Sequence, residues 1–195
     1  MLRHDLRPAV DAVDRSLELV EAQRWIAFRP WPRALKAELS LLGGIDGGVT
    51  EEVEQEWALS CQLGDPCWEA MTARVLGLLS ARRGDYSTAM TWLDSALRRC
   101  ESVTDMYLWV KAYVLDSKIE FMLARNDRQT TPQLIDSLTT IAARCDMGEF
   151  VARAQLHRWR LGDTGALDAA QLLAANVDNP ALHRRIDHAR NEQRR

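Results

Sequence analysis

Apolar residues recur every three to four positions along most of the chain, in segments separated by short polar turns. This is the period of an amphipathic α-helix, and the strict alternation typical of β-strands is absent. The predicted helices span residues 8–28, 32–43, 50–63, 66–83, 86–100, 104–125, 131–145, 147–161, 164–176 and 179–192. The sequence therefore predicts an all-α protein with about ten helices.

Several predicted helix ends carry residues that favour caps. Asp65, Thr131 and Asn179 each precede a proline. Such side chains can accept hydrogen bonds from the free amides of a first helical turn. Proline is tolerated in that turn because the amide hydrogen that it lacks would have no partner within the helix. Other boundaries carry a glycine, which readily adopts the left-handed conformation that closes a helix. These glycines are Gly64, Gly84 and Gly162.

Two helices differ in how much of their circumference is apolar. Helix 104–125 is apolar around nearly its whole surface, so it must be covered on more than one side. Helix 179–192 has only a thin apolar stripe, as a terminal cap would. This contrast is typical of stacked helical hairpins, in which a central helix contacts its partner and both neighbouring hairpins. We therefore expect a single domain over residues 1–195, closed by a capping helix.

Turns within the predicted hairpins fall near Gly44, Gly84, Asn126 and Gly162, at intervals typical of helical repeats. The pattern is most specific over residues 66–100. Its key residues are Leu76, Gly77, Gly84, Tyr86, Ala89, Leu93 and Ala96. Their spacing is that of a tetratricopeptide repeat (TPR). We expect Gly77 and Ala89 to lie where the two helices of this hairpin approach closely.

The match to a TPR is imperfect. Ala73 and Ser80 stand where the repeat usually has large aromatic residues, and Glu101 stands where a proline often ends the unit. The other hairpins match only by their period and by small residues. The predicted fold is a right-handed superhelical stack of TPR-like antiparallel hairpins.

Four segments carry a more particular family resemblance. They are Trp25–Pro32 (WIAFRPWP), Leu63–Glu69 (LGDPCWE), Trp109–Asp116 (WVKAYVLD) and Leu156–Ala166 (LHRWRLGDTGA). Together they resemble the helical-repeat region that follows the ATPase module in large bacterial regulators of the LuxR/MalT type, especially those of actinobacteria. The resemblance extends over roughly residues 20–182.

In that family the repeat region is implied to act as a sensor or an interaction platform. An upstream nucleotide-binding module and a C-terminal helix-turn-helix carry out the switching and the DNA binding. This chain contains no Gly-x-x-x-x-Gly-Lys-Ser/Thr phosphate loop, and too few residues follow Leu182 for a DNA-binding domain. We therefore expect either a repeat fragment or an independent relative that kept only the repeats.

Composition and charge narrow the classes of partner. The formal charge is −3, which gives no general attraction to nucleic acid or to anionic membranes. No apolar run is long enough to span a bilayer, and no secretion signal is evident, so we expect a cytoplasmic protein. Seven tryptophans accompany only three phenylalanines and three tyrosines. We expect their rings to fill contacts between hairpins.

Residues suited to catalysis or metal binding show no supporting pattern. The four histidines lack the spacing that places two ligands on one helix face, and we expect them to be solvated on the surface. The four cysteines form no Cys-x-x-Cys pair and are predicted to be free, buried thiols. No Gly-x-Ser-x-Gly motif is present. The sequence therefore predicts a protein that is not an enzyme and has no catalytic residues, metal or cofactor.

Charged residues at helical spacing form the candidate binding site. Arg74, Leu78 and Arg82 recur every four positions on the first helix of the best repeat, and Asp116 and Glu120 do so on helix 104–125. The arginines could bind a carboxylate or phosphate in a concave groove. Alternatively, they could pair with Asp116 and Glu120 and bind nothing.

Charge is also unevenly distributed along the chain. Eight acidic residues and no Lys or Arg lie between Ala37 and Ala73, whereas residues 184–195 carry five arginines. A solvated acidic face with a frayed basic tail explains this pattern, and so does docking of each end to a differently charged partner.

These observations predict a TPR-like protein–protein interaction module associated with bacterial transcriptional regulation. Its concave surface would capture a helix or an extended peptide. The alternative is a helical-repeat domain of a LuxR/MalT-type regulator that senses a small-molecule effector. We expect a protein or peptide partner, with no direct binding to nucleic acid or membrane.

Overall fold

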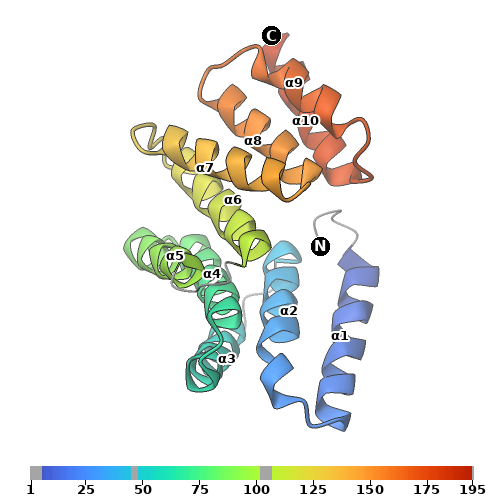
Figure 1. The fold of residues 1–195 in the computed structure, drawn as a ribbon, viewed down its shortest axis with the longest axis vertical. Helices are drawn as coiled ribbons and strands as arrows, with labels where there is room; N and C mark the ends of the chain where they lie inside the picture. Colours follow the sequence, from blue (N-terminus) through green and yellow to red (C-terminus); the bar gives the residue numbers. More distant parts are fainter. Residues whose placement is uncertain (1–5, 45–47, 102–106, 195) are drawn as a thin grey trace. The chain divides into compact units, whose positions relative to one another are not determined.

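The computed structural model describes residues 6–44, 48–101 and 107–194, and within them the regular secondary structure is entirely helical. The helices are α1 (Leu6–Ala22), η1 (Ile26–Phe28, a short 3-10 helix), α2 (Pro30–Leu42), α3 (Val49–Leu63), α4 (Pro66–Arg82), α5 (Tyr86–Glu101), α6 (Leu108–Ala124), α7 (Thr131–Arg144), α8 (Gly148–Arg160), α9 (Ala166–Ala174) and α10 (Pro180–Gln193). The prediction of an all-α chain with about ten helices is confirmed (Figure 1). None of the described helices is both long and apolar enough to cross a membrane.

The described residues form two compact units that divide between Val110 and Lys111. The first unit contains α1 to α5 and the first residues of α6. The second contains the rest of α6 and α7 to α10. The single domain predicted over residues 1–195 and the superhelical arrangement of its hairpins remain predictions.

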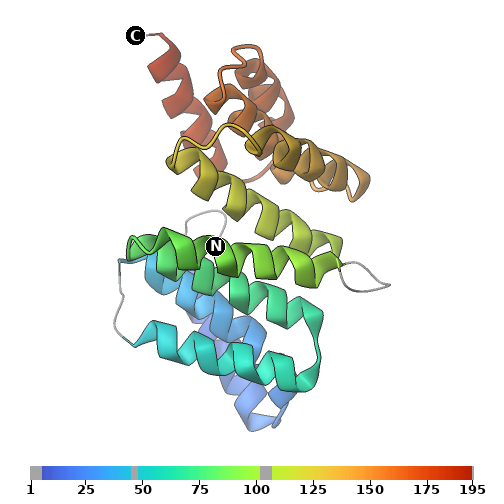
Figure 2. The same ribbon diagram turned by 90° about the vertical axis from the view of Figure 1, so that its left-hand side faces the viewer.

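Helices of the first unit pack on their sequence neighbours, from α1 on α2 through to α4 on α5, and α2 also packs on α4. Figures 1 and 2 show α3, α4 and α5 following one another through short turns. The core of the unit lies where α2, α3 and α4 meet. Its fully enclosed members are Ala34, Ala37, Val53, Val75, Leu76 and Leu79.

Tryptophan rings lie between helices of the first unit. Trp31 of α2 contacts Trp68 of α4 and Trp109 of α6, with ring centroids 5.4 and 4.9 Å apart. Trp57 of α3 contacts Trp92 of α5 at 5.1 Å. Two of the three contacts, α2 with α4 and α3 with α5, join helices two apart in sequence, as expected for rings that fill spaces between successive hairpins.

Gly77 lies at the closest approach of α4 and α5. A Cβ atom at this position would come within 2.9 Å of Leu93 Cγ and within 3.2 Å of the carbonyl oxygen of Ala89. Leu93 and Ala89 are both fully buried. The predicted close approach at Gly77 and Ala89 is therefore confirmed, and it explains why a residue without a side chain occupies the middle of this helix.

Gly77→Ala should destabilise the first unit by about 1–3 kcal/mol, because overpacking against Leu93 and the α5 backbone outweighs the better helix propensity of alanine. Urea unfolding followed by circular dichroism measures this change. In a Leu93→Ala background the added methyl group has room, so the same substitution should there be neutral or stabilising. Equal costs in both backgrounds would contradict the close contact with Leu93.

Helices of the second unit also pack on their neighbours: α7 on α8, α8 on α9 and α9 on α10, with a further contact between α8 and α10. The core draws on α8, α9 and α10, and includes Ala152, Leu156, Leu167, Ala170, Leu182 and Ile186. α10 buries only Ala181, Leu182, Ile186 and Ala189, which agrees with its predicted thin apolar stripe.

Most predicted helix ends are confirmed by their capping geometry. Asp65 and Asn179 each accept hydrogen bonds from two backbone amides of the following first turn. Gly64, Gly84 and Gly162 have the left-handed backbone expected of them, with φ of 66°, 80° and 106°. These residues close one helix and begin the next over very few positions.

The predicted cap at Thr131 is wrong. Thr131 is the first residue of α7, and its hydroxyl donates to the carbonyl oxygen of Asp127 in the preceding turn. The hydroxyl is therefore used as a donor and does not cap the helix.

The predicted helix 8–28 is also wrong beyond Ala22. Arg24 adopts a left-handed backbone with φ of 55°, and the Trp25 amide donates to the Val20 carbonyl, which closes the helix. Phe28 then belongs to the separate 3-10 helix η1. The predicted beginning of helix 104–125 lies outside the described residues.

Candidate functional site

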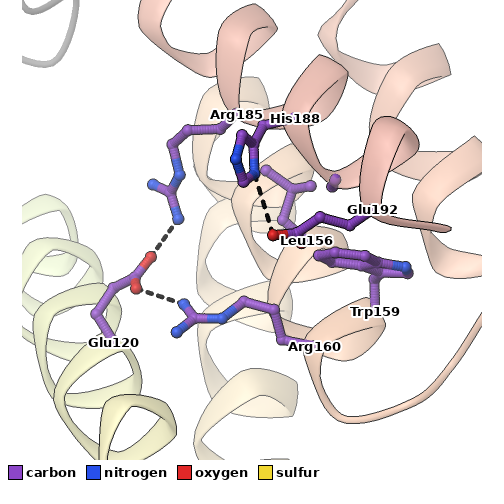
Figure 3. A pocket seen from close by; sticks show the side chains of 8 residues that line it. Glu120, Leu156, Trp159, Arg160, Arg185, His188 and Glu192 are labelled. Atoms are coloured by element: carbon purple, nitrogen blue, oxygen red, sulfur yellow. Dashed lines mark hydrogen bonds and ion pairs between the residues drawn. The ribbon is translucent and has the colours of Figure 1, made fainter. Parts of the chain in front are cut away.

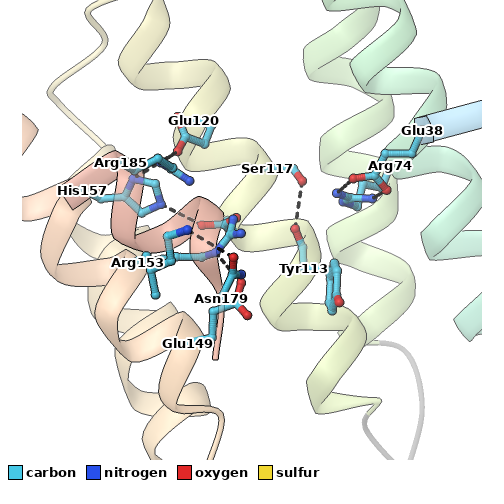
Figure 4. Close-up of polar contacts among 12 residues, drawn as sticks. Glu38, Arg74, Tyr113, Ser117, Glu120, Glu149, Arg153, His157, Asn179 and Arg185 are labelled. Carbon is cyan, nitrogen blue, oxygen red and sulfur yellow. Dashed lines mark hydrogen bonds and ion pairs between the residues drawn. The ribbon is translucent and has the colours of Figure 1, made fainter. Parts of the chain in front are cut away.

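A buried ion network joins α6 to α8 in the second unit (Figure 4). The Asp116 carboxylate, 7% exposed, lies 2.8 Å from Arg153 Nη1 and 2.8 Å from His157 Nε2. Arg153 Nε donates to Glu149 at 2.9 Å. Burial alone would raise the pKa of the Asp116 carboxyl, but Arg153 and the His157 hydrogen bond outweigh it and hold this pKa well below its ordinary value. Asp116 is therefore an ionised, fully paired carboxylate.

His157 is enclosed completely and holds the centre of this network. Because a carboxylate only accepts hydrogen bonds, Nε2 donates to Asp116. Nδ1 has no hydrogen-bond partner among the described residues, and Glu120 Oε1 lies 3.8 Å from it. The prediction that His157 is a solvated surface residue is wrong, whereas His183 and His188 are exposed as expected. His4 lies outside the described residues.

Glu120 forms the second charged centre, one helical turn beyond Asp116. Its two carboxylate oxygens pair with Arg160 of α8, at 2.5 Å, and with Arg185 of α10. Burial opposes ionisation of Glu120, but the neighbouring His157, Arg185 and Arg160 lower its pKa below the ordinary value. Glu120 thus links three helices through charge-assisted hydrogen bonds.

The Glu120 centre forms one wall of a pocket of about 510 Å³ (Figure 3). The pocket lies between α6, α8 and α10. Its lining residues are Glu120, Leu156, Trp159, Arg160, Arg185, His188, Ala189 and Glu192. Its volume is within the range of small-molecule sites, roughly 300–1,000 Å³. We refer to it as the α10 pocket.

An exposed apolar surface covers the α1–η1–α2 corner of the first unit. Leu19, Trp25, Ile26 and Phe28 are 51–57% exposed, and the rings of Trp25 and Phe28 lie 6.2 Å apart. They adjoin a groove of about 240 Å³. Its lining residues are Val13, Ser16, Leu19, Val20, Trp25, Phe28, Trp31, Pro32 and Leu35. Large apolar residues clustered in this way on a surface mark an interaction site more often than single ones do. We refer to this region as the η1 surface.

The structure places the predicted groove residues in both units. Arg74 is 5% exposed and forms a bidentate ion pair with Glu38 of α2, with distances of 2.7 and 2.8 Å. Leu78 is half-buried, and Arg82 is exposed. Asp116 and Glu120 belong to the second unit and pair there with residues of α8 and α10. A groove formed by all five residues therefore remains a prediction.

Three residues of the acidic segment form buried ion pairs within the first unit. Glu38 binds Arg74, Glu56 binds Arg29 and Glu69 binds Arg99. All three carboxylates are buried or nearly so, and the picture of a merely solvated acidic face is wrong for them.

The predicted frayed basic tail is likewise wrong. α10 continues to Gln193, and Arg185 and Arg190 form ion pairs with Glu120 and Asp168.

Six residues of the ion networks were not predicted as site residues: Glu38, Glu149, Arg153, His157, Arg160 and Arg185. One signal was present, because Glu149, Arg153, His157 and Arg160 recur at three- and four-residue intervals along α8. Such spacing places them on one face of the helix. α8 also packs against the core of the second unit. Basic residues on one face of such a helix need acidic partners on a neighbouring helix.

The cysteines have the properties of structural thiols. All four are free, and Cys67 and Cys100 are buried, as predicted, whereas Cys61 and Cys145 are half-buried. Burial, aided by Asp65 and Cys100, raises the pKa of the Cys67 thiol to about 12. Cys67 therefore stays protonated near neutral pH. Within the described ranges, no three His, Cys, Asp or Glu side chains are arranged to hold a metal ion.

Comparison with protein-family models, with curated proteins and with solved structures gives no match to this chain.

Proposed function

We propose that this chain is a non-enzymatic, TPR-like protein-interaction module in bacterial transcriptional regulation. The packing of α4 on α5 around Gly77 and the ring contacts that link α2, α4 and α6 support a stack of TPR-like hairpins. The regulatory setting rests on the four segments that resemble the repeat region of LuxR/MalT-type regulators.

The observation that carries the interaction role is the η1 surface. Trp25, Ile26 and Phe28 leave about half of their area in water, although the same corner contains a groove that could enclose apolar groups. Burial of apolar area contributes roughly 25 cal/mol per Å². Partners that bring large apolar side chains to this groove would therefore gain most of their binding energy here.

The groove fits an amphipathic helix better than a charged or extended chain. Ser16 is the only residue of its lining with a polar side-chain atom other than the indole nitrogens, so backbone groups of an extended peptide would find few partners. A helix satisfies its own backbone and presents apolar side chains along one face. We therefore assign an amphipathic helix of a partner protein as the occupant.

Selection from a displayed peptide library on the full chain tests this assignment. We expect enriched peptides to carry large apolar residues at helical spacing. The selected peptides should bind a Trp25→Ser/Phe28→Ser variant at least tenfold more weakly, because two contact rings are lost. Since both rings are half exposed, the variant should retain the circular dichroism spectrum of the wild-type chain.

Leu172→Ser provides the matched control, because Leu172 is an exposed apolar residue of the second unit. Its peptide affinities should equal those of the wild-type chain. Peptides without an apolar helical pattern, or equal binding to the Trp25/Phe28 variant, would refute the η1 surface as the docking site.

Sensing of a small-molecule effector is the second candidate, and the α10 pocket favours it. The pocket has the volume of a ligand site, and it combines an indole ring with charged groups. A ligand there would contact α6, α8 and α10 together.

A further inference from the structure

The α10 pocket has two chemically different ends (Figure 3). Arg160 and Arg185 converge on Glu120 at one end. Trp159 and Leu156 form an apolar wall at the other end, beside the Glu192 side chain. A ligand that fills the pocket must therefore have one charged or polar end and one apolar end.

The charged end can still donate hydrogen bonds. Arg160 bonds to Glu120 through Nη1 and Arg185 through Nη2, and the described residues give neither arginine another acceptor. Each guanidinium has five N–H groups. The two side chains are 31% and 35% exposed, so their remaining donors are accessible from the pocket.

The unused guanidinium donors at this end suit an anion. Two guanidinium groups share the single carboxylate of Glu120, and Arg185 also lies in the field of the buried Asp116 carboxylate. The carboxylate of Glu192, the other acidic residue of the lining, lies 3.3 Å from His188 Nδ1. A planar carboxylate matches the donor geometry of arginine better than a spherical anion does.

The apolar end favours an aromatic ring. Trp159 is partly buried against the core of the second unit, so its indole is held in place by packing. A ring stacked on a fixed indole gains contact area at little cost in side-chain entropy. We propose that the α10 pocket binds a small aromatic carboxylate, with its ring on Trp159 and its carboxylate on Arg160 and Arg185.

This inference deepens the effector-sensing candidate and rests on it. It is independent of the η1 surface, which belongs to the first unit. Loss of ligand binding would leave the interaction role intact, and loss of peptide binding would leave the ligand site intact. Each proposal therefore fails or stands by its own experiment.

Nuclear magnetic resonance with ¹⁵N-labelled tryptophan tests the site directly, because Trp159 is the only tryptophan in the pocket lining. The probes are indole-3-acetate and its uncharged analogue indole-3-acetamide. We expect indole-3-acetate to shift the Trp159 indole signal in a saturable manner. The amide should bind at least tenfold more weakly, because it cannot form charge-assisted bonds to the arginines.

Matched variants assign the charged contact. Arg185→Gln should weaken indole-3-acetate binding at least tenfold, whereas Arg190→Gln should not, since Arg190 lies on the same helix but pairs with Asp168 away from the lining. Arg160→Gln and Arg158→Gln form a second such pair on α8. If Arg185→Gln fails to fold, as its tryptophan spectrum would show, the α8 pair decides.

Three results would overturn the proposal. They are the absence of a saturable Trp159 shift, equal affinity for the acid and the amide, and undiminished binding by the folded Arg185→Gln and Arg160→Gln variants.

Discussion

Asp116→Asn should destabilise the second unit by about 3 kcal/mol. The substitution removes the negative charge that compensates Arg153 in a site where both side chains are almost fully buried. Breaking a buried ion pair costs more than the pair contributes, because Arg153 keeps its desolvation penalty and retains only Glu149 as a charged partner. Hydrogen exchange of α8 amides should accelerate by roughly a hundredfold, and exchange in α4 of the first unit serves as the internal reference.

Asp136→Asn is the matched control, because Asp136 pairs with Arg158 in an exposed position of the same unit. Exposed pairs contribute little, so exchange in α8 should hardly change. Equal acceleration by both substitutions would show that the buried network does not hold α6 and α8 together.

The difference between wild type and Asp116→Asn should depend on pH. The folded state lowers the pKa of Asp116, so its ionised form contributes stability that is fully present above the unfolded pKa of about 3.9. This contribution is lost as the pH falls from that value toward the folded pKa. The two proteins should therefore differ by a constant amount from pH 7 to about pH 4, and the difference should shrink as the pH falls further. A difference that stays constant below about pH 4 would contradict an ionised Asp116.

Arg74→Ala should destabilise the first unit by about 3 kcal/mol, because it leaves the Glu38 carboxylate buried without its bidentate partner. Urea unfolding and hydrogen exchange in α2 and α4 measure the change. Arg82→Ala, at an exposed position on the same helix, should have almost no effect. Little change on Arg74→Ala would show that the buried pair contributes no stability.

Joint replacement of the pair separates charge from packing. Arg74→Met with Glu38→Leu removes both charges but keeps apolar volume, and should recover much of the lost stability. This double variant also supplies a folded protein in which Arg74 is absent. Unchanged partner affinity in that protein would exclude Arg74 from the predicted groove.

Local patterns explain why the helices and the α4–α5 hairpin could be predicted. Gly77 and Ala89 mark a close helix approach at a fixed spacing, and Asp65 caps the helix that follows it directly. Each of these features acts over a few residues, so the sequence contains all the information needed. The end of α1 lacked such a mark, because Arg24 adopts a backbone conformation for which arginine has no preference.

The ion networks could not be predicted in the same way. Arg74 pairs with a residue 36 positions away, and His157 with one 41 positions away. Helical period shows that Arg74 and Asp116 each lie on a face with other polar residues, but the choice of partner depends on which faces pack together. Arg74, Asp116 and Glu120 of the predicted groove therefore belong to buried ion networks. The prediction did not include the residues that balance their charges.

The distribution of tryptophan has a practical consequence for optical measurements. Six of the seven indoles belong to the first unit, and five of those six have another indole ring within 5.4 Å between centroids. Their emission and near-ultraviolet circular dichroism will dominate any spectrum of the whole chain. The second unit contributes Trp159 alone, so it could melt with barely a change in total fluorescence. A variant that keeps Trp159 as its only tryptophan would report the unfolding of the second unit through its fluorescence.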